Sequence, residues 1–197
     1  MARVRRYSWV FFLVVIVVLV VVTVGYFWQD RQARITSTKA NELSSAIKLA
    51  ETDTDAAKEQ LAVLAADPTN GNSVLASFES AELSLREGDA AGAAAALDAL
   101  ASVRDGDPYA KAATIFSVYA DINAGDAATL LGKLNPLVAE DGVFTALALD
   151  RTAPVLAREG NTDEALAVLE TLLGREGLER DLQARAETLR DSLGSGS

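Results

Sequence analysis

The side chains that most often perform chemistry in proteins are scarce in this sequence. It contains no cysteine and no histidine, which excludes disulfides, thiolate nucleophiles and imidazole bases and removes the usual zinc ligands. The nearest approach to a serine and lysine nucleophile pair lies in Ser37-Thr38-Lys39 and Ser44-Ser45. On a helix just beyond an apolar run, these residues are better interpreted as solvated surface. We therefore predict no catalytic residue and a protein that is not an enzyme.

Two pairs of aspartates have a spacing that suits a calcium ion, which prefers clustered carboxylate oxygens. These pairs are Asp53 with Asp55 and Asp105 with Asp107. Neither has the glycine at the sixth position and the closing glutamate of a calcium loop, so helix capping and turn formation explain them better. We expect no metal, no cofactor and no small-molecule substrate.

The charge balance excludes one class of partner. The chain carries 28 acidic and 18 basic residues, a net charge of −10. Arg3, Arg5 and Arg6 precede every acidic residue, so the remainder is three charges more negative, at −13. Such a surface repels phosphate backbones, and we expect no nucleic-acid binding.

One long apolar stretch, from Trp9 to Trp28, reads WVFFLVVIVVLVVVTVGYFW. No residue between Tyr7 and Gln29 carries a charge, and a helix of this length spans roughly 30 Å, the thickness of a bilayer core. In hydrocarbon a single crossing chain can pair its backbone groups only as a helix, in spite of the many valines. The two tryptophans at its ends are typical of membrane interfaces. Residues 9–28 are therefore predicted to be a transmembrane helix.

The alternative for this stretch is a cleaved signal peptide. That would need a shorter apolar region, of about 7 to 15 residues, ending at small residues. Here the run is longer and closes on the bulky Tyr26-Phe27-Trp28, so a retained anchor is favoured. The arginines among the first six residues keep residues 1–8 in the cytoplasm as a short tail by the positive-inside rule. The rest of the chain is then predicted to lie on the opposite side of the membrane.

Beyond the anchor the sequence repeats a turn followed by apolar residues at fixed offsets of five, nine and twelve. The turns begin at residues 52, 88, 125 and 160, which are 36, 37 and 35 residues apart. Such self-similarity indicates an array of repeats. The four sets are Thr52-Asp53 with Ala57, Leu61 and Leu64; Gly88-Asp89 with Ala93, Leu97 and Leu100; Gly125-Asp126 with Leu130, Leu134 and Leu137; and Gly160-Asn161 with Ala165, Leu169 and Leu172.

Each repeat reads as a helix, a turn and a second helix. Glycine ends a helix in a left-handed conformation, and the following Asp or Asn caps the next helix. A small residue twelve positions before each turn lets the paired helices approach closely; these are Ala40, Ala76, Ala113 and Ala148. Pro136 and Pro154 should kink or shorten their helices.

The sequence thus predicts an all-α protein in which the transmembrane helix is followed by an α-solenoid. About four helix pairs occupy residues 32–193, of which residues 178–193 form a C-terminal capping helix. The Gly-Ser end, residues 194–197, is expected to be disordered.

A helix pair of about 34 residues, with a small residue in its first helix and a Gly-Asp turn, resembles the tetratricopeptide repeat. The match is degenerate, because no unit has the consensus tryptophan and leucines stand where the second helix usually has an aromatic residue. The whole chain resembles the YfgM-like ancillary subunits of the bacterial SecYEG translocon. The resemblance rests on Arg5-Arg6-Tyr7 before the anchor, on Gly25-Tyr26-x-Trp28 where the anchor leaves the membrane, and on the repeats directly beyond it. The leucines are Leu61, Leu97, Leu134 and Leu169, and the polar residues after the exit are Gln29, Arg31 and Gln32.

This resemblance implies a periplasm-facing scaffold in the bacterial inner membrane that links the translocon with periplasmic chaperones or exported clients. The family has no catalytic motif. Members often carry a longer cytosolic tail than the eight residues found here, so cytosolic contacts do not carry over. A second hypothesis is a structural accessory subunit that is bound to a larger membrane complex through its transmembrane helix.

In tetratricopeptide geometry the inner face is formed by positions ten, six and two residues before each turn. The residues at these positions are partly apolar and partly polar or charged. Such a surface suits a peptide or helix whose apolar side chains dock while Arg86, Asn123 and Arg158 hold its backbone or charges. The alternative is that Phe78, Ile115 and Tyr119 belong to the core. The candidate protein-binding residues are Phe78, Glu82 and Arg86; Ile115, Tyr119 and Asn123; and Asp150, Pro154 and Arg158.

Overall fold

A computed structural model describes residues 41–67, 71–104 and 106–195 of the chain. The chain divides into two compact units, Met1–Ser45 and Ala46–Ser197. In the first unit only residues 41–45 are described, and they are helical; the second unit is described below by itself. The predicted cytoplasmic tail and the predicted span 9–28 lie outside the described residues. No helix of the part that is described has the length and apolar character needed to span a bilayer.

The described residues form α-helices and turns, with no β-strand among them. The prediction of an all-α protein is therefore confirmed. After a helical stretch that ends at residue 49, the helices are α2 (Thr54–Ala66), α3 (Ser73–Arg86), α4 (Ala90–Val103), α5 (Pro108–Asp121), α6 (Ala127–Ala139), α7 (Thr145–Arg158), α8 (Thr162–Leu173) and α9 (Arg180–Gly194).

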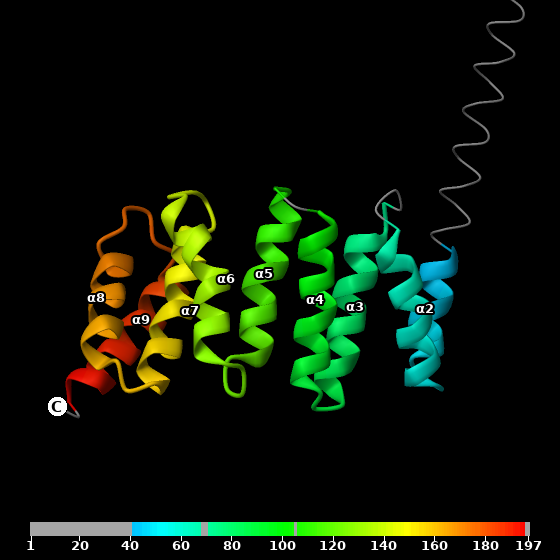
Figure 1. Cartoon of the computed structure of the whole chain (residues 1–197), viewed down its shortest axis with the longest axis horizontal. Helices are drawn as coiled ribbons and strands as arrows, with labels where there is room; N and C mark the ends of the chain where they lie inside the picture. Colours follow the sequence, from blue (N-terminus) through cyan, green and yellow to red (C-terminus); the bar gives the residue numbers. More distant parts are fainter. Residues whose placement is uncertain (1–40, 68–70, 105, 196–197) are drawn as a thin grey trace, which may run out of the picture. The chain divides into compact units, whose positions relative to one another are not determined.

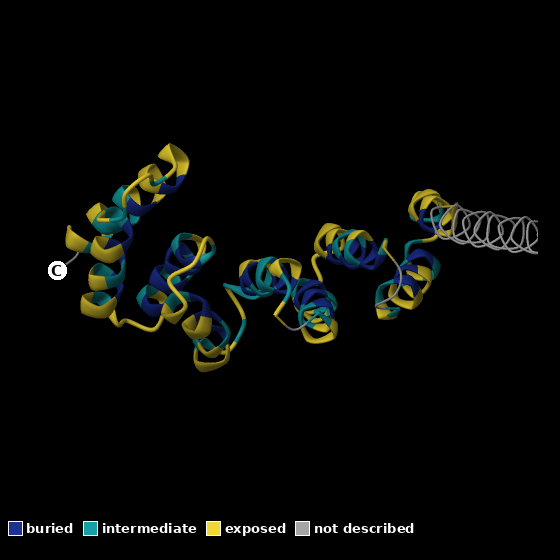
Figure 2. Ribbon diagram, turned by 90° about the horizontal axis from the view of Figure 1, so that it is seen from above, coloured by how far each residue is buried: buried dark blue, intermediate teal, exposed yellow. Residues whose placement is uncertain are grey.

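The helices of the second unit stack in chain order. Each packs against the next along the chain (Figure 1), and further contacts join α2 to α4, α5 to α7 and α7 to α9. Buried residues lie on the sides that the helices turn toward one another, and exposed residues face outward (Figure 2). Contacts confined to near neighbours are those of an α-solenoid.

The core follows the repeat offsets found in the sequence. Every apolar residue five, nine and twelve positions after a turn is at most 8% exposed. Ala76, Ala113 and Ala148, in the first helices of their pairs, are fully buried, whereas Ala40 lies outside the described residues. The pattern therefore identifies the helix faces that meet.

Side-chain size sets how closely the helices approach. Helix α4 is mostly alanine, with Ala93 fully buried, and it makes extensive close contacts with both α3 and α5. Helix α6 instead turns Leu130, Leu134 and Leu137 toward its neighbours, and α5 approaches it less closely than it approaches α4. Larger side chains at the interface hold two helices further apart.

The glycine turns are of two kinds. Gly88 and Gly160 have positive φ angles of 79° and 80°, as predicted for glycines that end a helix. Gly125 is not among the residues with positive φ. Glycine is favoured at this position for a different reason: a Cβ atom on residue 125 would lie only 2.9 Å from the carbonyl oxygen of Asp121.

The predicted helix caps are found at the aspartates. The carboxylates of Asp53, Asp89 and Asp126 accept backbone N–H groups three residues ahead, at 3.0, 2.8 and 2.8 Å. Asn161 precedes α8 but makes no side-chain capping bond, so the capping prediction is wrong there.

The two prolines lie inside helices that continue past them. Helix α7 contains Pro154 and has 14 residues, the same length as α3, α4 and α5. Pro136 lies in the last turn of α6, where Glu140 donates its backbone N–H to the Pro136 carbonyl at 3.1 Å. Neither helix is shortened, because packing on both sides outweighs one missing backbone bond.

Candidate protein-binding surface

An open, mostly apolar pocket of about 380 Å³ lies between α5 and α7. Phe116 and Tyr119 of α5 are 51% and 53% exposed in it, and Leu147 of α7 is 39% exposed. Aromatic rings left in water at a concave surface are typical of binding sites. We call this the α5/α7 pocket; its lining residues are Ala112, Ile115, Phe116, Tyr119, Phe144, Leu147 and Arg151.

The surface continues from the pocket onto α3. The ring of Phe78 meets that of Phe116 edge to face, with centroids 5.6 Å apart and planes at 87°. Glu82 lies one helical turn beyond Phe78 and therefore on the same side of α3. We call Phe78, Glu79 and Glu82 the α3 rim.

Arg151 supplies the charged side chain of the α5/α7 pocket. Its guanidinium lies 4.7 Å from the centre of the Tyr119 ring, a cation–π contact, and 2.9 Å from the carboxylate of Asp150. Asp150 also faces Arg185 of α9 at 3.3 Å. Asp150 is buried and pairs there with both arginines, of which Arg185 ties α7 to α9.

The structure brings several predicted residues together and separates others. Tyr119 and Ile115 line the α5/α7 pocket, and Phe78 adjoins it through Phe116. Ile115 is only 5% exposed and also belongs to the core of α5, α6 and α7. Pro154, by contrast, is half-buried in α7 and does not line the pocket.

The three residues predicted to hold a partner's charges lie at or just after the C-terminal ends of α3, α5 and α7 and do not line the pocket. Asn123 is exposed in the turn after α5. Arg86 forms an ion pair with Glu82 on α3. Arg158 donates to the carbonyl oxygens of Ile122 and Gly125, at 2.5 and 2.6 Å. Arg158 thus binds one carbonyl at the C-cap of α5 and another in the turn before α6.

The surface register differs by one residue from the one deduced from the sequence. Ile115 and Asp150, ten residues before their turns, are buried, and only Ile115 reaches the pocket wall; Phe116 and Arg151, nine residues before, both line the pocket. One residue rotates a side chain by about 100° around a helix. Sequence reasoning therefore missed the pocket residues Ala112, Phe116, Phe144, Leu147 and Arg151, although the four-residue spacings of 112 to 116 and of 147 to 151 were a signal for such a stripe.

Of the three described aspartates that were weighed as calcium ligands, two cap helices, and Asp55 lies in the first turn of α2. Asp53 caps α2, and Asp107 caps α5 by accepting the Tyr109 N–H at 2.8 Å. That hydrogen bond, together with nearby Arg104, lowers the pKa of Asp107. Within the described ranges, no group of three or more acidic, histidine or cysteine side chains is placed to hold a metal ion; Asp105 lies outside them.

Ion pairs join successive repeats. Lys133 of α6 pairs with Asp98 of α4 at 2.6 Å, and Arg185 with Asp150, each 35 residues apart in sequence. The ammonium of Lys58 pairs with Glu87, which raises the pKa of Lys58. Among the described residues, half of the ion pairs thus join neighbouring repeats, and the other half are local to one helix or turn.

No family model, curated protein or solved structure matches the chain. The fold and the surface define an all-α protein of solenoid type with an exposed aromatic pocket.

Proposed function

We propose that the chain is a single-pass protein of the bacterial inner membrane whose tetratricopeptide-like repeats face the periplasm and bind other polypeptides. In this proposal it is a scaffold or chaperone-type subunit of the Sec translocon, aiding protein export or envelope assembly. Its partners are translocon subunits, periplasmic chaperones or exported clients. The apolar, charge-free stretch 9–28 and the arginines before it support the anchor and its orientation.

The observation that carries the binding function is the exposure of Phe116, Tyr119 and Leu147 around one pocket. Covering apolar surface with a partner's side chain releases water and contributes roughly 25 cal/mol per Å². Aromatic residues in a recess are the usual centres of binding energy at protein interfaces. The α5/α7 pocket therefore suits one or two large apolar side chains of a partner.

The mechanism requires no bond to be made or broken. A membrane anchor keeps the pocket close to polypeptides that emerge from or work beside a translocon, which raises their effective concentration. A weak site is then sufficient, and release is fast.

Site-specific photocrosslinking tests this proposal in the full chain within membranes. A photoreactive amino acid at position 119, in the pocket, should crosslink to translocon subunits or periplasmic chaperones. The same amino acid at position 63, where Val63 of α2 is 69% exposed away from the pocket, is the matched control. Equal crosslinking from both positions, or none from position 119, would refute the proposed site.

Exchanging the anchor separates this function from that of an accessory subunit held by its transmembrane helix. With an unrelated transmembrane helix in place of residues 9–28, binding through the repeats should persist. Loss of association after this exchange, with Phe116→Ala having no effect, would favour the accessory subunit.

A further inference from the structure

We propose that the occupant of the α5/α7 pocket is a cationic, apolar polypeptide segment, in which large apolar side chains are interleaved with lysine or arginine. This inference rests on the proposed function, and it names the chemistry of the partner. The apolar side chains enter the pocket, and the cations face the carboxylates of the α3 rim and the acidic surface around it.

The basic side chains that border this surface are already matched by carboxylates. Arg86 pairs with Glu82, and Arg151 pairs with Asp150. In residues 41–195, ten of the twelve lysines and arginines form ion pairs within the repeats. An acidic partner would therefore find few cations that are not already paired, and it would have to displace a bound carboxylate.

Among the residues that are described, the α3 rim offers one carboxylate without an ion-pair partner, that of Glu79, beside the aromatic rings, because Glu82 is paired with Arg86. Glu79 and Glu82 precede the turn at residue 88 by nine and six residues, as Phe116 and Tyr119 precede the turn at residue 125. The two helices are linked at this level by the Phe78 and Phe116 rings. Glu79 has no ion-pair partner within the part of the chain that the structure describes. A cation held at Glu79 would lie one helix away from an apolar side chain in the pocket.

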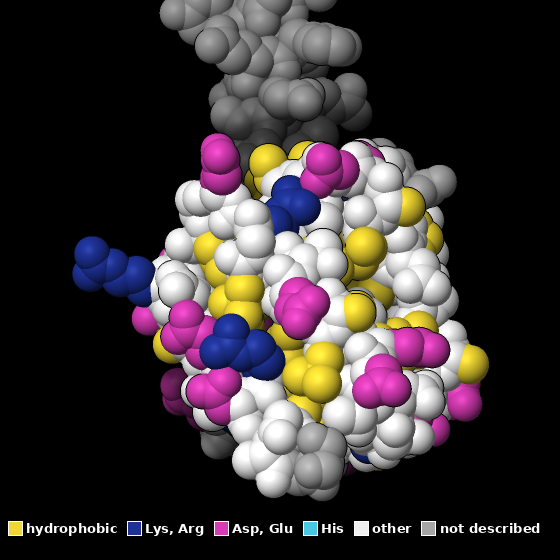
Figure 3. All heavy atoms as spheres, turned by 90° about the vertical axis from the view of Figure 1, so that its left-hand side faces the viewer, with side chains coloured by type: hydrophobic (Ala, Val, Ile, Leu, Met, Phe, Trp, Pro, Cys, Tyr) yellow, Lys and Arg dark blue, Asp and Glu magenta, His cyan; other side chains and the backbone are white. Residues whose placement is uncertain are grey.

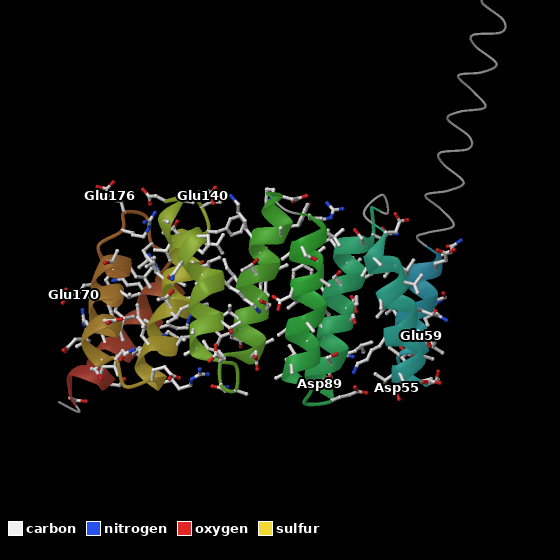
Figure 4. All side chains as sticks on the ribbon, viewed as in Figure 1. Asp55, Glu59, Asp89, Glu140, Glu170 and Glu176 are labelled. Carbon is white, nitrogen blue, oxygen red and sulfur yellow. The ribbon has the colours of Figure 1, made fainter. Side chains whose placement is uncertain are left out.

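The wider surface of the repeats also carries mainly negative charge. Asp55 and Asp89 lie along one edge of the stack, at the turns within pairs, and Glu140 and Glu176 lie along the other (Figure 4). At the α8 and α9 end, acidic side chains are spread over the visible face and basic ones are sparser (Figure 3). A field of one sign attracts cationic segments and repels anionic ones.

The aromatic rings add to this preference. Tyr119 already stacks beneath one guanidinium, that of Arg151, and exposed aromatic faces attract lysine and arginine in the same way. The pocket thus suits both parts of the proposed segment, its apolar side chains and its cations.

The test uses the full chain in nanodiscs of zwitterionic lipid, with empty nanodiscs as the background. Three fluorescent peptides share the same leucines and phenylalanines and carry lysine, glutamine or glutamate between them. At low salt we expect the lysine peptide to bind about tenfold more tightly than the glutamate peptide, with glutamine between them. At about 500 mM salt this ratio should fall to about two, because exposed charges are screened.

Paired variants locate the effect. The double variant Glu79→Gln with Glu82→Gln should bind the lysine peptide about two- to fivefold more weakly than the parent and bind the glutamine peptide with unchanged affinity. Glu170→Gln with Glu176→Gln makes the same change in net charge at the α8 end and should have little effect (Figure 4). Phe116→Ala should lower the affinity for both the lysine and the glutamine peptide about tenfold.

The outcomes separate the two proposals. Equal affinity for all three peptides, with the effect of Phe116→Ala intact, would overturn the cationic partner and leave the proposed binding function standing. An equal loss from both glutamate pairs would overturn the α3 rim as the site of the cations. If no peptide binds, or if Phe116→Ala leaves the binding of all three peptides unchanged, the pocket and the proposed function are both overturned.

Discussion

Single residues fix the ends of the helices through carboxylates that must be ionised. Asp126 accepts the Thr129 hydroxyl at 2.7 Å and the Thr129 N–H at 2.8 Å. These bonds, the hydroxyl first, lower the pKa of Asp126. The charge on Asp126 therefore stabilises the fold at neutral pH.

Replacing Asp126 tests this through the pH dependence of stability. A lowered folded-state pKa contributes stability above the unfolded pKa of about 3.9, and this contribution disappears as the pH falls through the folded value. Asp126→Asn keeps an acceptor and removes the charge, so it should be less stable than the parent at pH 6 to 7. The difference should vanish as the pH falls below about 4. Urea unfolding followed by circular dichroism measures it, and a difference that persists at about pH 2 would show that the charge is not its cause.

Arg158 shows why the function of a residue is hard to infer from its position in a repeat. Its place two residues before a turn predicts a side chain directed at a partner. Its donors instead reach Ile122 and Gly125 of the preceding repeat. Its role in binding stays a prediction, since an exposed guanidinium can contact a partner while it caps a loop.

At the scale of a helix, the size of the residues at the interface controls the spacing. Ala93 is fully buried where α4 meets its neighbours, and Ala95, two residues on, is exposed. Ala93→Leu should destabilise the repeats by about 1–3 kcal/mol, because the extra methylenes must separate packed helices. Ala95→Leu is the matched control and should change stability by less than about 0.5 kcal/mol. Similar unfolding midpoints for the two variants would contradict the close packing of α4.

The helices themselves were predictable because three signals in the sequence agree: the turn residues, the apolar residues at fixed offsets after each turn, and the alanine twelve residues before it. The rotation of each helix about its axis was not, since it is set jointly by both neighbours. This is why Ile115 was expected at the surface that Phe116 occupies. The pairs Asp98 with Lys133 and Asp150 with Arg185 were likewise missed, although a spacing of one repeat between opposite charges could have indicated them.

At the scale of the described repeats, stability is local because each helix depends on near neighbours. Cores are shared between successive helices, and α9 closes the last one with Leu182 and Ala186. In such an array, free energy is approximately a sum over repeats and their interfaces. A defect at one end should therefore leave the other end protected.

Leu182→Ala tests this division in the full chain. Leu182 is 4% exposed, and its truncation should cost about 2–5 kcal/mol. Hydrogen exchange followed by mass spectrometry should accelerate in α8 and α9, and less in α7, while α3 and α4 keep their protection. Val143→Ala, at a side chain that is 88% exposed, should leave exchange unchanged everywhere. A uniform increase from α2 to α9 would mean that the repeats unfold as one cooperative unit.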